Sequence, residues 1–411
     1  MNYLGKESPF LKKIDNPFCS MEQRLEALEA VLSKQNMPVI AKDLQSRRID
    51  FHLHSNYSDG YWTSSGLFLE AYRRGMSYIS LTDHDCFTGI EEGFKARDLI
   101  YQVTGKKIGF IPGVEFSTNY IDGSYKIREI HILGYFPSKT FKKFRSHLNK
   151  IDIFSEAYLE AFQKCRILRI YEMVKKFNQE LPYRVGGTLL ALSKIGDPIL
   201  PKMVKRGLRC SVSPGRLLTC TGVYEILILY KSGRIDEIYD DSFSKDYLEK
   251  LTNFMEPFNS PHELMGKYFG NTEPSAKVGY IGKTEDPKWA VKMIQTMGGI
   301  PVLAHPILYF DLLHELLEEL FPLGLLGVEV ISSNATQKDL DQLREMDQFI
   351  EKSYPNLVVT AGSDCHGHSV DGKFDYTPNN PMGLRQDFED LLMKHTHRMI
   401  HLFDLECEAV S

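Results

Sequence analysis

The sequence predicts an α/β fold in which strands alternate with crossover helices and a mostly helical insertion interrupts the pattern. From residue 49, short apolar strand patterns such as RIDFHLH and SYISLTDHD alternate with helix patterns such as TSSGLFLEAYRRG. After a long charged stretch, the alternation resumes at DPKWAVKMIQTMGGIPVLAHP. We therefore expect one α/β barrel or open sheet whose sequence is split by the insertion.

Four segments follow from this pattern. Residues 1–48 form a helical extension, in which SMEQRLEALEAVLSKQ has apolar residues at helical spacing behind Ser20 as the N-cap; we interpret it as a packing helix. Residues 49–136 form the first part of the barrel, residues 137–273 the helical insertion and residues 274–400 the second part. The expected strands are RIDFHLH, SYISLTDHD, KIGFIPGVEFS, IREIHILGYF, GIPVLAHP, LGVEVIS and NLVVTAGSDCHG.

Composition narrows the class of protein. The 411 residues are 43% hydrophobic and 25% charged, which is typical of a globular chain. A net charge of −5 gives no overall attraction to nucleic acid, so long nucleic acid is not the expected partner. Seven cysteines without CxxC spacing indicate reduced thiols and a cytoplasmic location. The opening MNYLGKESPFLKK lacks a signal peptide and no apolar run approaches about 20 residues, so we expect no membrane contact.

Histidine or acidic residues recur where the expected strands end. The carboxyl ends of parallel strands share one edge, where active sites are built. Isolated core histidines would not repeat at that position, and a crowd of imidazoles and carboxylates is best stabilised by divalent cations such as Mn, Fe or Zn. The residues are His52, His54, Asp83, His84, Asp85, Glu115, His131, His305, Asp364 and His366.

These motifs resemble the PHP (polymerase and histidinol phosphatase) family of metal-dependent phosphoesterases. The resemblance rests on DFHLHSNYSDG, LTDHD, IPGVEFS, EIHILGY, PVLAHP, GVEV and AGSDCHG, and covers residues 49–136 and 274–385. It implies a distorted (β/α)7 barrel. The chain is most similar to the branch that hydrolyses nucleoside 3',5'-bisphosphates and trims short RNA from its 5' end, which also carries a helical insertion.

The resemblance further implies two to three divalent metal ions per chain, up to a trinuclear centre. Its ligands would be His52, His54, Asp59, His84, Glu115, His131, His305, Asp364 and His366. Glu115 would bridge two ions, and Asp364, Glu115 and His305 would be the catalytic residues. Asp83 and Asp85 would orient His84. The implied reaction is hydrolysis of small phosphate monoesters or nucleotides through a metal-bridged hydroxide.

The substrate is the less determined part. Arg166 and Arg169 share a helix face in the insertion and could bind a phosphate, or could belong to a solvated basic face. Asp197 stands where the related branch has an arginine, which disfavours a second phosphate. Two other enzyme readings stay open: a 5'-3' exoribonuclease that trims oligonucleotides, and an amidohydrolase-like metal hydrolase. A scaffold protein that keeps only the fold is the non-enzymatic alternative.

Overall fold

The computed structural model describes residues 9–15, 19–33, 49–58, 60, 62–137, 285–332, 339–367, 382–384, 388–403 and 405, with the single residues 249 and 253. The chain divides into two compact units, one formed by Met1–Ser155 with Glu285–Ser411 and the other by Glu156–Thr284. Asp59, Arg166, Arg169 and Asp197 lie outside the described residues, as does nearly all of the expected insertion. The boundaries of the four expected segments stay a prediction.

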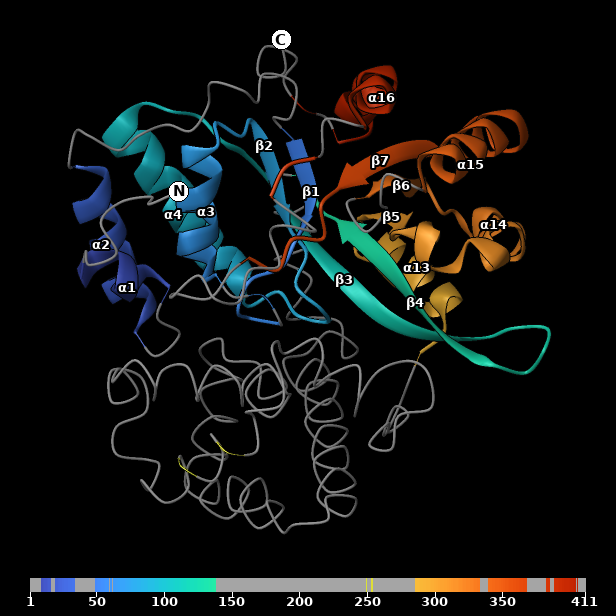
Figure 1. Cartoon of the computed structure of the whole chain (residues 1–411), viewed down its shortest axis with the longest axis horizontal. Coiled ribbons are helices and arrows are strands. Elements are labelled where there is room, and N and C mark those ends of the chain that lie inside the picture. Colours follow the sequence, from blue (N-terminus) through green and yellow to red (C-terminus); the bar gives the residue numbers. More distant parts are fainter. Residues whose placement is uncertain are drawn as a thin grey trace. The chain divides into compact units, whose positions relative to one another are not determined.

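Seven strands in the described part of the chain form one sheet in sequence order (Figure 1). They are β1 Ile49–Leu53, β2 Tyr78–Leu81, β3 Gly109–Ile121, β4 Ile127–Tyr135, β5 Ile300–Leu303, β6 Gly327–Ser332 and β7 Val358–Gly362. A parallel bridge between Leu53 and Cys365, just beyond β7, brings the first and last strands together. The sheet is therefore a nearly closed barrel, which confirms the expected fold class.

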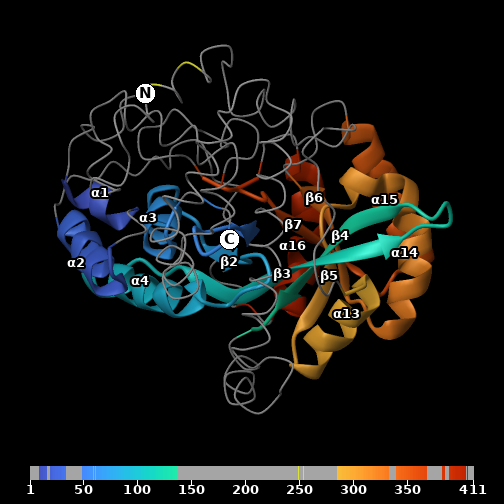
Figure 2. The ribbon, with the colours of Figure 1, turned by 90° about the horizontal axis from the view of Figure 1, so that it is seen from below.

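Eight α-helices in the described residues belong to this first unit, and in Figures 1 and 2 they lie outside the strands. They are α1 Pro9–Ile14, α2 Met21–Leu32, α3 Ser64–Arg73, α4 Gly89–Thr104, α13 Pro287–Thr296, α14 Leu313–Leu320, α15 Leu340–Ser353 and α16 Glu389–Leu402, with the short 3-10 helices η2 Pro306–Leu312 and η3 Phe321–Leu323.

Local sequence signals explain where several helices begin and end. Ser20 and Gln23 form a capping box at the start of α2, which confirms the expected N-cap. Thr63 caps α3 and Asp286, followed by Pro287, caps α13. Helix α4 ends at Gly105, whose φ of 73° suits glycine. No described helix has both the length and the apolar character required to cross a membrane.

The fourth strand corrects the expectation of uniformly parallel strands. Strand β4 is antiparallel to both β3 and β5, while the other neighbouring pairs are parallel. Only the residues from Asp122 to Lys126 connect β3 to β4, too few for a crossover helix. The two strands form a long hairpin (Figure 1). His131 and Glu115 therefore lie within strands rather than at strand ends.

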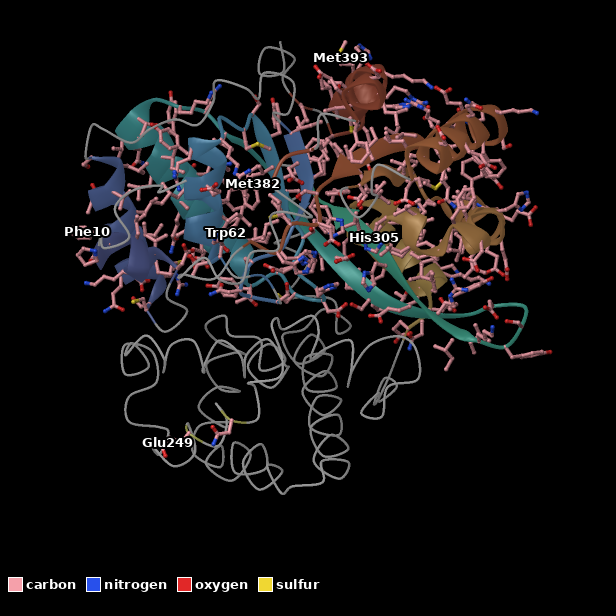
Figure 3. The ribbon with its side chains drawn as sticks, viewed as in Figure 1. Phe10, Trp62, Glu249, His305, Met382 and Met393 are labelled. Atoms are coloured by element: carbon pink, nitrogen blue, oxygen red, sulfur yellow. The ribbon has the colours of Figure 1, made fainter. Side chains whose placement is uncertain are left out.

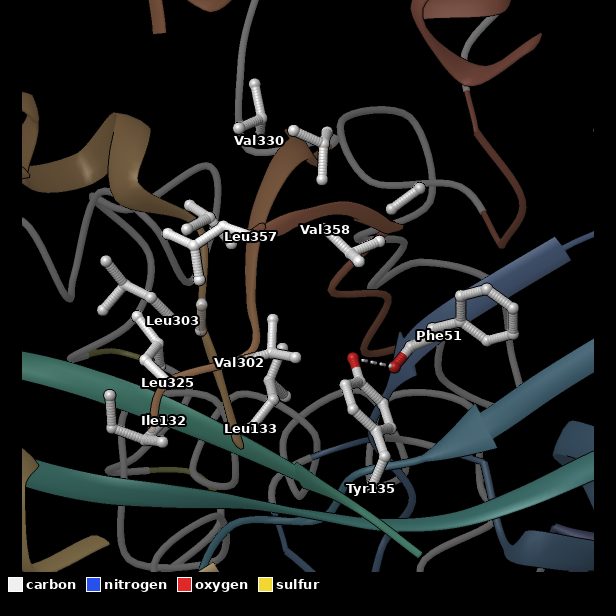
Figure 4. Close-up of a cluster of buried hydrophobic side chains, with 14 of the residues drawn as sticks. Phe51, Ile132, Leu133, Tyr135, Val302, Leu303, Leu325, Val330, Leu357 and Val358 are labelled. Carbon is white, nitrogen blue, oxygen red and sulfur yellow. Dashed lines mark hydrogen bonds between the residues drawn. The ribbon is translucent and has the colours of Figure 1, made fainter. Parts of the chain in front are cut away.

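The core fills the barrel and the space beneath its helices. Strands β1, β6 and β7 are buried along their whole length, as expected for strands covered on both faces. Figure 4 shows part of this core, where Leu133 and Val302 pack among other apolar side chains. In the same view the Tyr135 hydroxyl donates to the Phe51 carbonyl oxygen at 2.8 Å, which satisfies a buried polar group.

Asp50 ties the first strand to the segments that close the barrel. Its Oδ1 accepts from the backbone N–H of Ser363 at 2.9 Å, and its Oδ2 accepts from that of Gly383 at 2.7 Å. Burial raises the pKa of Asp50 to about 6, although these hydrogen bonds oppose the rise. The side chain is therefore a buried acceptor for donors that are more than 300 residues away.

We expect Asp50→Ala to lower the free energy of unfolding by at least about 2 kcal/mol, because it leaves the buried N–H groups of His52, Ser363 and Gly383 without their acceptor. Asp122→Ala is the matched comparison: Asp122 Oδ1 accepts from Ser124 and Lys126, but only within the hairpin turn. Its expected loss is smaller because the turn is local. Urea unfolding measures both. A change of less than about 0.5 kcal/mol for Asp50→Ala would contradict a closing role.

Candidate metal centre

The structure brings eight of the nine expected ligands into one cluster, six from the carboxyl ends of parallel strands and two, Glu115 and His131, from within the β3–β4 hairpin; Asp59 lies outside the described residues. Three overlapping groups have ligand atoms within 4.8 Å of one another. They are His52, His54, Glu115 and Asp364; His84, Glu115 and His131; and His54, His84 and His366. The eighth residue, His305, joins through Glu115 and is labelled in Figure 3.

Glu115 is the centre of this cluster. It comes from the middle of β3, and its carboxylate is almost completely buried. Its Oε1 lies 2.8 Å from His131 Nδ1 and 3.1 Å from His305 Nε2. Its Oε2 lies within 3.2 Å of one ring nitrogen from each of three further histidines, His52, His54 and His84. One carboxylate therefore contacts five imidazoles that come from four segments, since His52 and His54 both belong to β1 and its carboxyl end.

These residues fit divalent metal ions. Despite its three close nitrogens, Glu115 Oε2 makes no hydrogen bond to the described part of the chain. The Nε2 atoms of His52 and His54 lie 3.1 Å apart, and both lie within 3.5 Å of Asp364 Oδ1. Imidazole nitrogens and carboxylate oxygens that converge this closely suit a cation. A set of imidazole nitrogens and carboxylate oxygens without a thiolate favours Zn, Mn or Fe.

A buried carboxylate that we did not predict, Glu329 on β6, orients His52. Both of its oxygens lie 3.0 Å from His52 Nδ1, and its Oε2 accepts from the backbone N–H of His305 at 3.1 Å. Such a contact fixes the tautomer in which the other ring nitrogen is free to bind a metal. Gly362 leaves it room, because a Cβ there would lie 2.3 Å from Glu329 Oε1. The available signal was an acidic residue inside an otherwise apolar strand.

Asp83 and Asp85 stabilise different histidines. Asp83, which we expected to orient His84, accepts from the hydroxyl groups of Ser55 and Ser58, each at 2.7 Å. The Ser58 hydroxyl lies 3.4 Å from Nδ1 of His54, so Asp83 supports that histidine instead. Asp85 accepts from the Ser117 N–H at 2.9 Å, and the Ser117 hydroxyl lies 3.2 Å from His84 Nδ1. Asp85 therefore acts on His84 through one intermediate residue.

Strained backbone places three of these side chains. Asp85, His305 and Asp364 have φ angles of 52°, 25° and 54°, in the region that non-glycine residues rarely adopt. Each such residue costs about 1–3 kcal/mol and persists only where the surrounding structure imposes it. The cluster is thus held in position before any ligand binds.

The charges of the cluster are strongly coupled. Burial lowers the pKa of His52, but the carboxylates of Glu329, Glu115 and Asp364 raise it well above its usual range. Burial also lowers the pKa of His131, but the carboxylate of Glu115 raises it well above its usual range. Burial raises the pKa of Glu115, but its neighbouring histidines lower it well below its usual range. In the metal-free protein these opposite shifts favour ion pairs between Glu115 and the imidazoles of His52 and His131.

Metal binding should accordingly weaken as the pH falls. Because the pKa values of His52 and His131 are raised, protons compete with the metal up to neutral pH and above. We expect the Mn²⁺ dissociation constant to decrease roughly tenfold for each unit by which the pH rises, for each proton that the metal displaces. Calorimetry in two buffers with different ionisation enthalpies counts the protons released. A dissociation constant that stays flat from about pH 6 to 8 would contradict this arrangement.

A second group of possible ligands lies away from the barrel mouth, on α15 and α16. Asp347 Oδ1 contacts His395 Nε2 at 2.7 Å, and Glu351 lies nearby. Lys394 Nζ lies 2.7 Å from a carboxylate oxygen of both Asp347 and Glu351. The ammonium group already supplies the positive charge there, so this group is an ion-pair network that fastens α16 to α15.

Comparisons with known proteins agree with the geometry. Residues 50–199 match the family model of the PHP domain. The chain is 36% identical over 100 residues to a 5'-3' exoribonuclease of Haemophilus influenzae, covering 24% of this chain and 32% of that protein. It is 35% identical over 86 residues to a 3',5'-nucleoside bisphosphate phosphatase of Chromobacterium violaceum, covering 21% and 26%. These matches thus span about a third or less of each relative.

A third relative matches over a much longer stretch. The chain is 25% identical over 327 residues to a phosphoribosyl 1,2-cyclic phosphate 1,2-diphosphodiesterase of Eggerthella lenta, covering 77% of this chain and 94% of that protein. Two solved structures resemble the fold: an amidohydrolase from Chromobacterium violaceum (TM-score 0.53, 19% identity, 85% and 96% coverage) and a protein from Bifidobacterium adolescentis described as a metal-dependent phosphoesterase (0.51, 16%, 84% and 96%).

Proposed function

Since this chain is a PHP-domain protein, we propose that it is a metal-dependent phosphoesterase that hydrolyses a small phosphate ester, such as a phosphate monoester or a nucleotide. The observation that carries the proposal is the arrangement around Glu115, where one buried carboxylate meets five histidines. The packing of a hydrophobic core does not require five imidazoles around one buried carboxylate. Glu115 Oε2, which three imidazole nitrogens approach within 3.2 Å, is the atom that a cation would satisfy.

Two to three ions of Mn, Fe or Zn are the proposed cofactors. His52, His54 and Asp364 would hold one, His131 and His305 a second, and Asp59, His84 and His366 a third, with Glu115 shared between the first two. Bound ions would acidify a water molecule and neutralise charge on the phosphoryl oxygens. The distances between ligand atoms also allow another division, in which His84 shares an ion with His131, or His54 shares one with His84 and His366.

The cluster has a closed side and an open side. His52, His54 and Glu115 are buried, whereas the side chains of Asp364, His131 and His366 are 14%, 17% and 23% exposed. The substrate would therefore approach from the open side. Although burial raises the pKa of Asp364, the imidazoles of His52 and His366 keep it well below its usual range. Asp364 is thus held as a carboxylate, which suits a metal ligand rather than a proton donor.

Support for a small substrate comes from the longest match. The relative that aligns over most of this chain is named for a small phosphorylated sugar, whereas the exoribonuclease aligns over 100 residues. The net charge of −5 also disfavours tracking along a nucleic-acid backbone. The local identity of 36% nevertheless makes trimming of short RNA the second candidate. An amidohydrolase-like activity is supported only by likeness of fold.

A substrate panel with Mn²⁺ tests the proposal. It compares kcat/KM for a mononucleotide, a nucleoside 3',5'-bisphosphate, a five-membered cyclic sugar phosphodiester and a short single-stranded RNA. We expect one of the small esters to be hydrolysed most efficiently. Cleavage of the RNA from its 5' end at an equal or higher kcat/KM would establish the second candidate instead. Turnover of none of them, but of a cyclic amide, would overturn the phosphoesterase assignment.

We place the enzyme in the cytoplasm. Cys19, Cys86 and Cys365, the cysteines within the described ranges, are free thiols, which suits a reducing compartment.

A further inference from the structure

We infer that the N-terminal arm, formed by α1 and α2, is a brace that positions the loop behind His54, of which the structure describes residues 55–58, 60 and 62. The inference deepens the proposed function, on which it rests, because that loop supports a histidine of the candidate metal centre. Both Figure 1 and Figure 2 show the arm beside α3 and α4. The arm is thus part of the barrel unit, and its role need not be confined to apolar packing.

The first contact of the brace is a buried arginine on α2. Arg24 is 1% exposed, and its Nε and Nη2 bind the two carboxylate oxygens of Glu92 on α4 at 3.0 and 2.5 Å. Its Nη2 also donates to the Tyr57 hydroxyl at 3.2 Å, and that hydroxyl donates to Glu92 Oε2 at 2.9 Å. Tyr57 belongs to the loop, so a triangle of hydrogen bonds joins arm, barrel helix and loop.

The second contact is at the other end of the loop. The Thr63 hydroxyl donates to the backbone oxygen of Ile14 at 2.6 Å, and the Thr63 N–H donates to Asp15 Oδ1 at 3.3 Å. Ile14 and Asp15 end α1, and Thr63 is the N-cap of α3. The arm therefore holds the loop at both ends.

Between these contacts the loop folds back on His54. The N–H groups of Ser58 and Gly60 both donate to the Ser55 oxygen, and Asn56 N–H donates to the oxygen of Trp62. A Cβ at Gly60 would lie 2.2 Å from the His54 oxygen, so only a glycine allows the loop to pass this close to the backbone of His54. Trp62 is buried there and is labelled in Figure 3. A shift of Tyr57 would thus be transmitted to its neighbour Ser58 and to His54.

Energetics favour an orienting role for Arg24. The arm already has apolar anchors, since Ala27, Leu28 and Val31 pack into the cluster that includes Leu53. A buried arginine–glutamate pair adds little net stability over apolar residues of similar size, because both charges lose their water. Its fixed bidentate geometry instead defines direction. We therefore assign Arg24 and Tyr57 as positioning residues.

The test compares Tyr57→Phe with Leu28→Ala in the full chain. Tyr57→Phe removes one hydroxyl and keeps the Arg24–Glu92 pair, whereas Leu28→Ala weakens the apolar packing of α2 and leaves every hydrogen bond between the arm and the loop in place. Hydrogen exchange of the metal-free protein reports the loop directly, and the Mn²⁺ concentration for half-maximal phosphoesterase activity reports the centre. Arg24→Lys is a third variant, which keeps the charge but loses the bidentate fork.

We expect Tyr57→Phe to speed exchange across residues 55–62 and to raise the half-maximal Mn²⁺ concentration, each by about tenfold, while kcat at saturating Mn²⁺ stays within about threefold of wild type. Arg24→Lys should shift both in the same direction. Leu28→Ala should lower Tm and leave both unchanged.

Equal exchange and equal Mn²⁺ dependence in Tyr57→Phe and wild type would overturn the inference. So would the same two shifts in Leu28→Ala, because general destabilisation would then explain them. Failure of the proposed function has a different signature: wild-type protein that binds no Mn²⁺ and hydrolyses no phosphate ester. In that case, the comparison of hydrogen exchange in Tyr57→Phe and wild type still tests whether the arm positions the loop.

Discussion

Glu115→Gln is expected to lower kcat/KM for phosphoester hydrolysis by at least about 100-fold. The substitution keeps the size of the side chain but removes its charge, and it places an NH₂ group among the five imidazoles. The pKa of Glu115 is held well below its usual range, against the effect of burial, by His84, His131 and His52. The charged form is therefore the one that the surrounding histidines stabilise, and an amide cannot replace it.

Glu129→Gln is the matched control for this change. Glu129 is also on the β3–β4 hairpin and its Oε1 lies 3.3 Å from His131 Nε2, but its side chain is 42% exposed. We expect its kcat/KM to stay within about threefold of wild type, because water replaces an exposed partner readily. Metal content of both variants should be measured with activity. Wild-type turnover in Glu115→Gln at full metal occupancy would move the chemistry away from this carboxylate.

Asp364→Ala is expected to have the second largest effect, again at least about 100-fold in kcat/KM. Asp364 lies on the open side of the cluster, with Oδ1 3.1 Å from His54 Nε2, and its backbone is held at a φ of 54°. Alanine removes a proposed ligand on the side from which the substrate would approach. Part of the loss should appear as a higher Mn²⁺ requirement, and the part that excess Mn²⁺ does not restore measures a contribution beyond metal affinity.

The control here is Asp347→Asn, at the ion-pair network of α15 and α16. Asp347 contacts a histidine at 2.7 Å as a buried carboxylate, so it matches Asp364 in chemistry but not in place. We expect it to lower the urea midpoint and leave kcat/KM of the folded enzyme unchanged. If Asp347→Asn lost activity to the same degree, the α15–α16 network would have to be reconsidered as a functional site.

The barrel and the convergence of most candidate ligands could be predicted from the sequence. Buried parallel strands are short, nearly continuous apolar runs, as in β7, and their ends are marked by the change to polar residues. Because such ends meet at one edge, His54 and Asp364 could be placed together across 310 positions of sequence. The ligand assignment itself stays a prediction.

The direction of β4 could not be read from its own residues, because alternation is the same in both directions. The short connection from Asp122 to Lys126 was the usable signal. Glu329 was overlooked because a carboxylate within a strand reveals its role only through its partner, which is His52, 277 residues away. Arg24 occupies a position in a helix where charge suggests a solvated face. Its burial depends on Glu92, 68 residues further along, and no local pattern encodes that pairing.

The antiparallel hairpin also determines where this chain can gain length. Ser117 lies opposite His131 and Glu115 opposite Leu133. Each pair is the same number of residues from the turn on both strands, so the register of the hairpin sets which side chains face the cluster. Residues added between Ile121 and Ile127 leave those pairs intact. One residue removed within either strand turns every later side chain to the other face and takes either Glu115 or His131 out of the cluster. The turn of the hairpin can therefore accept inserted residues during evolution, whereas strands β3 and β4 cannot change in length without loss of the site.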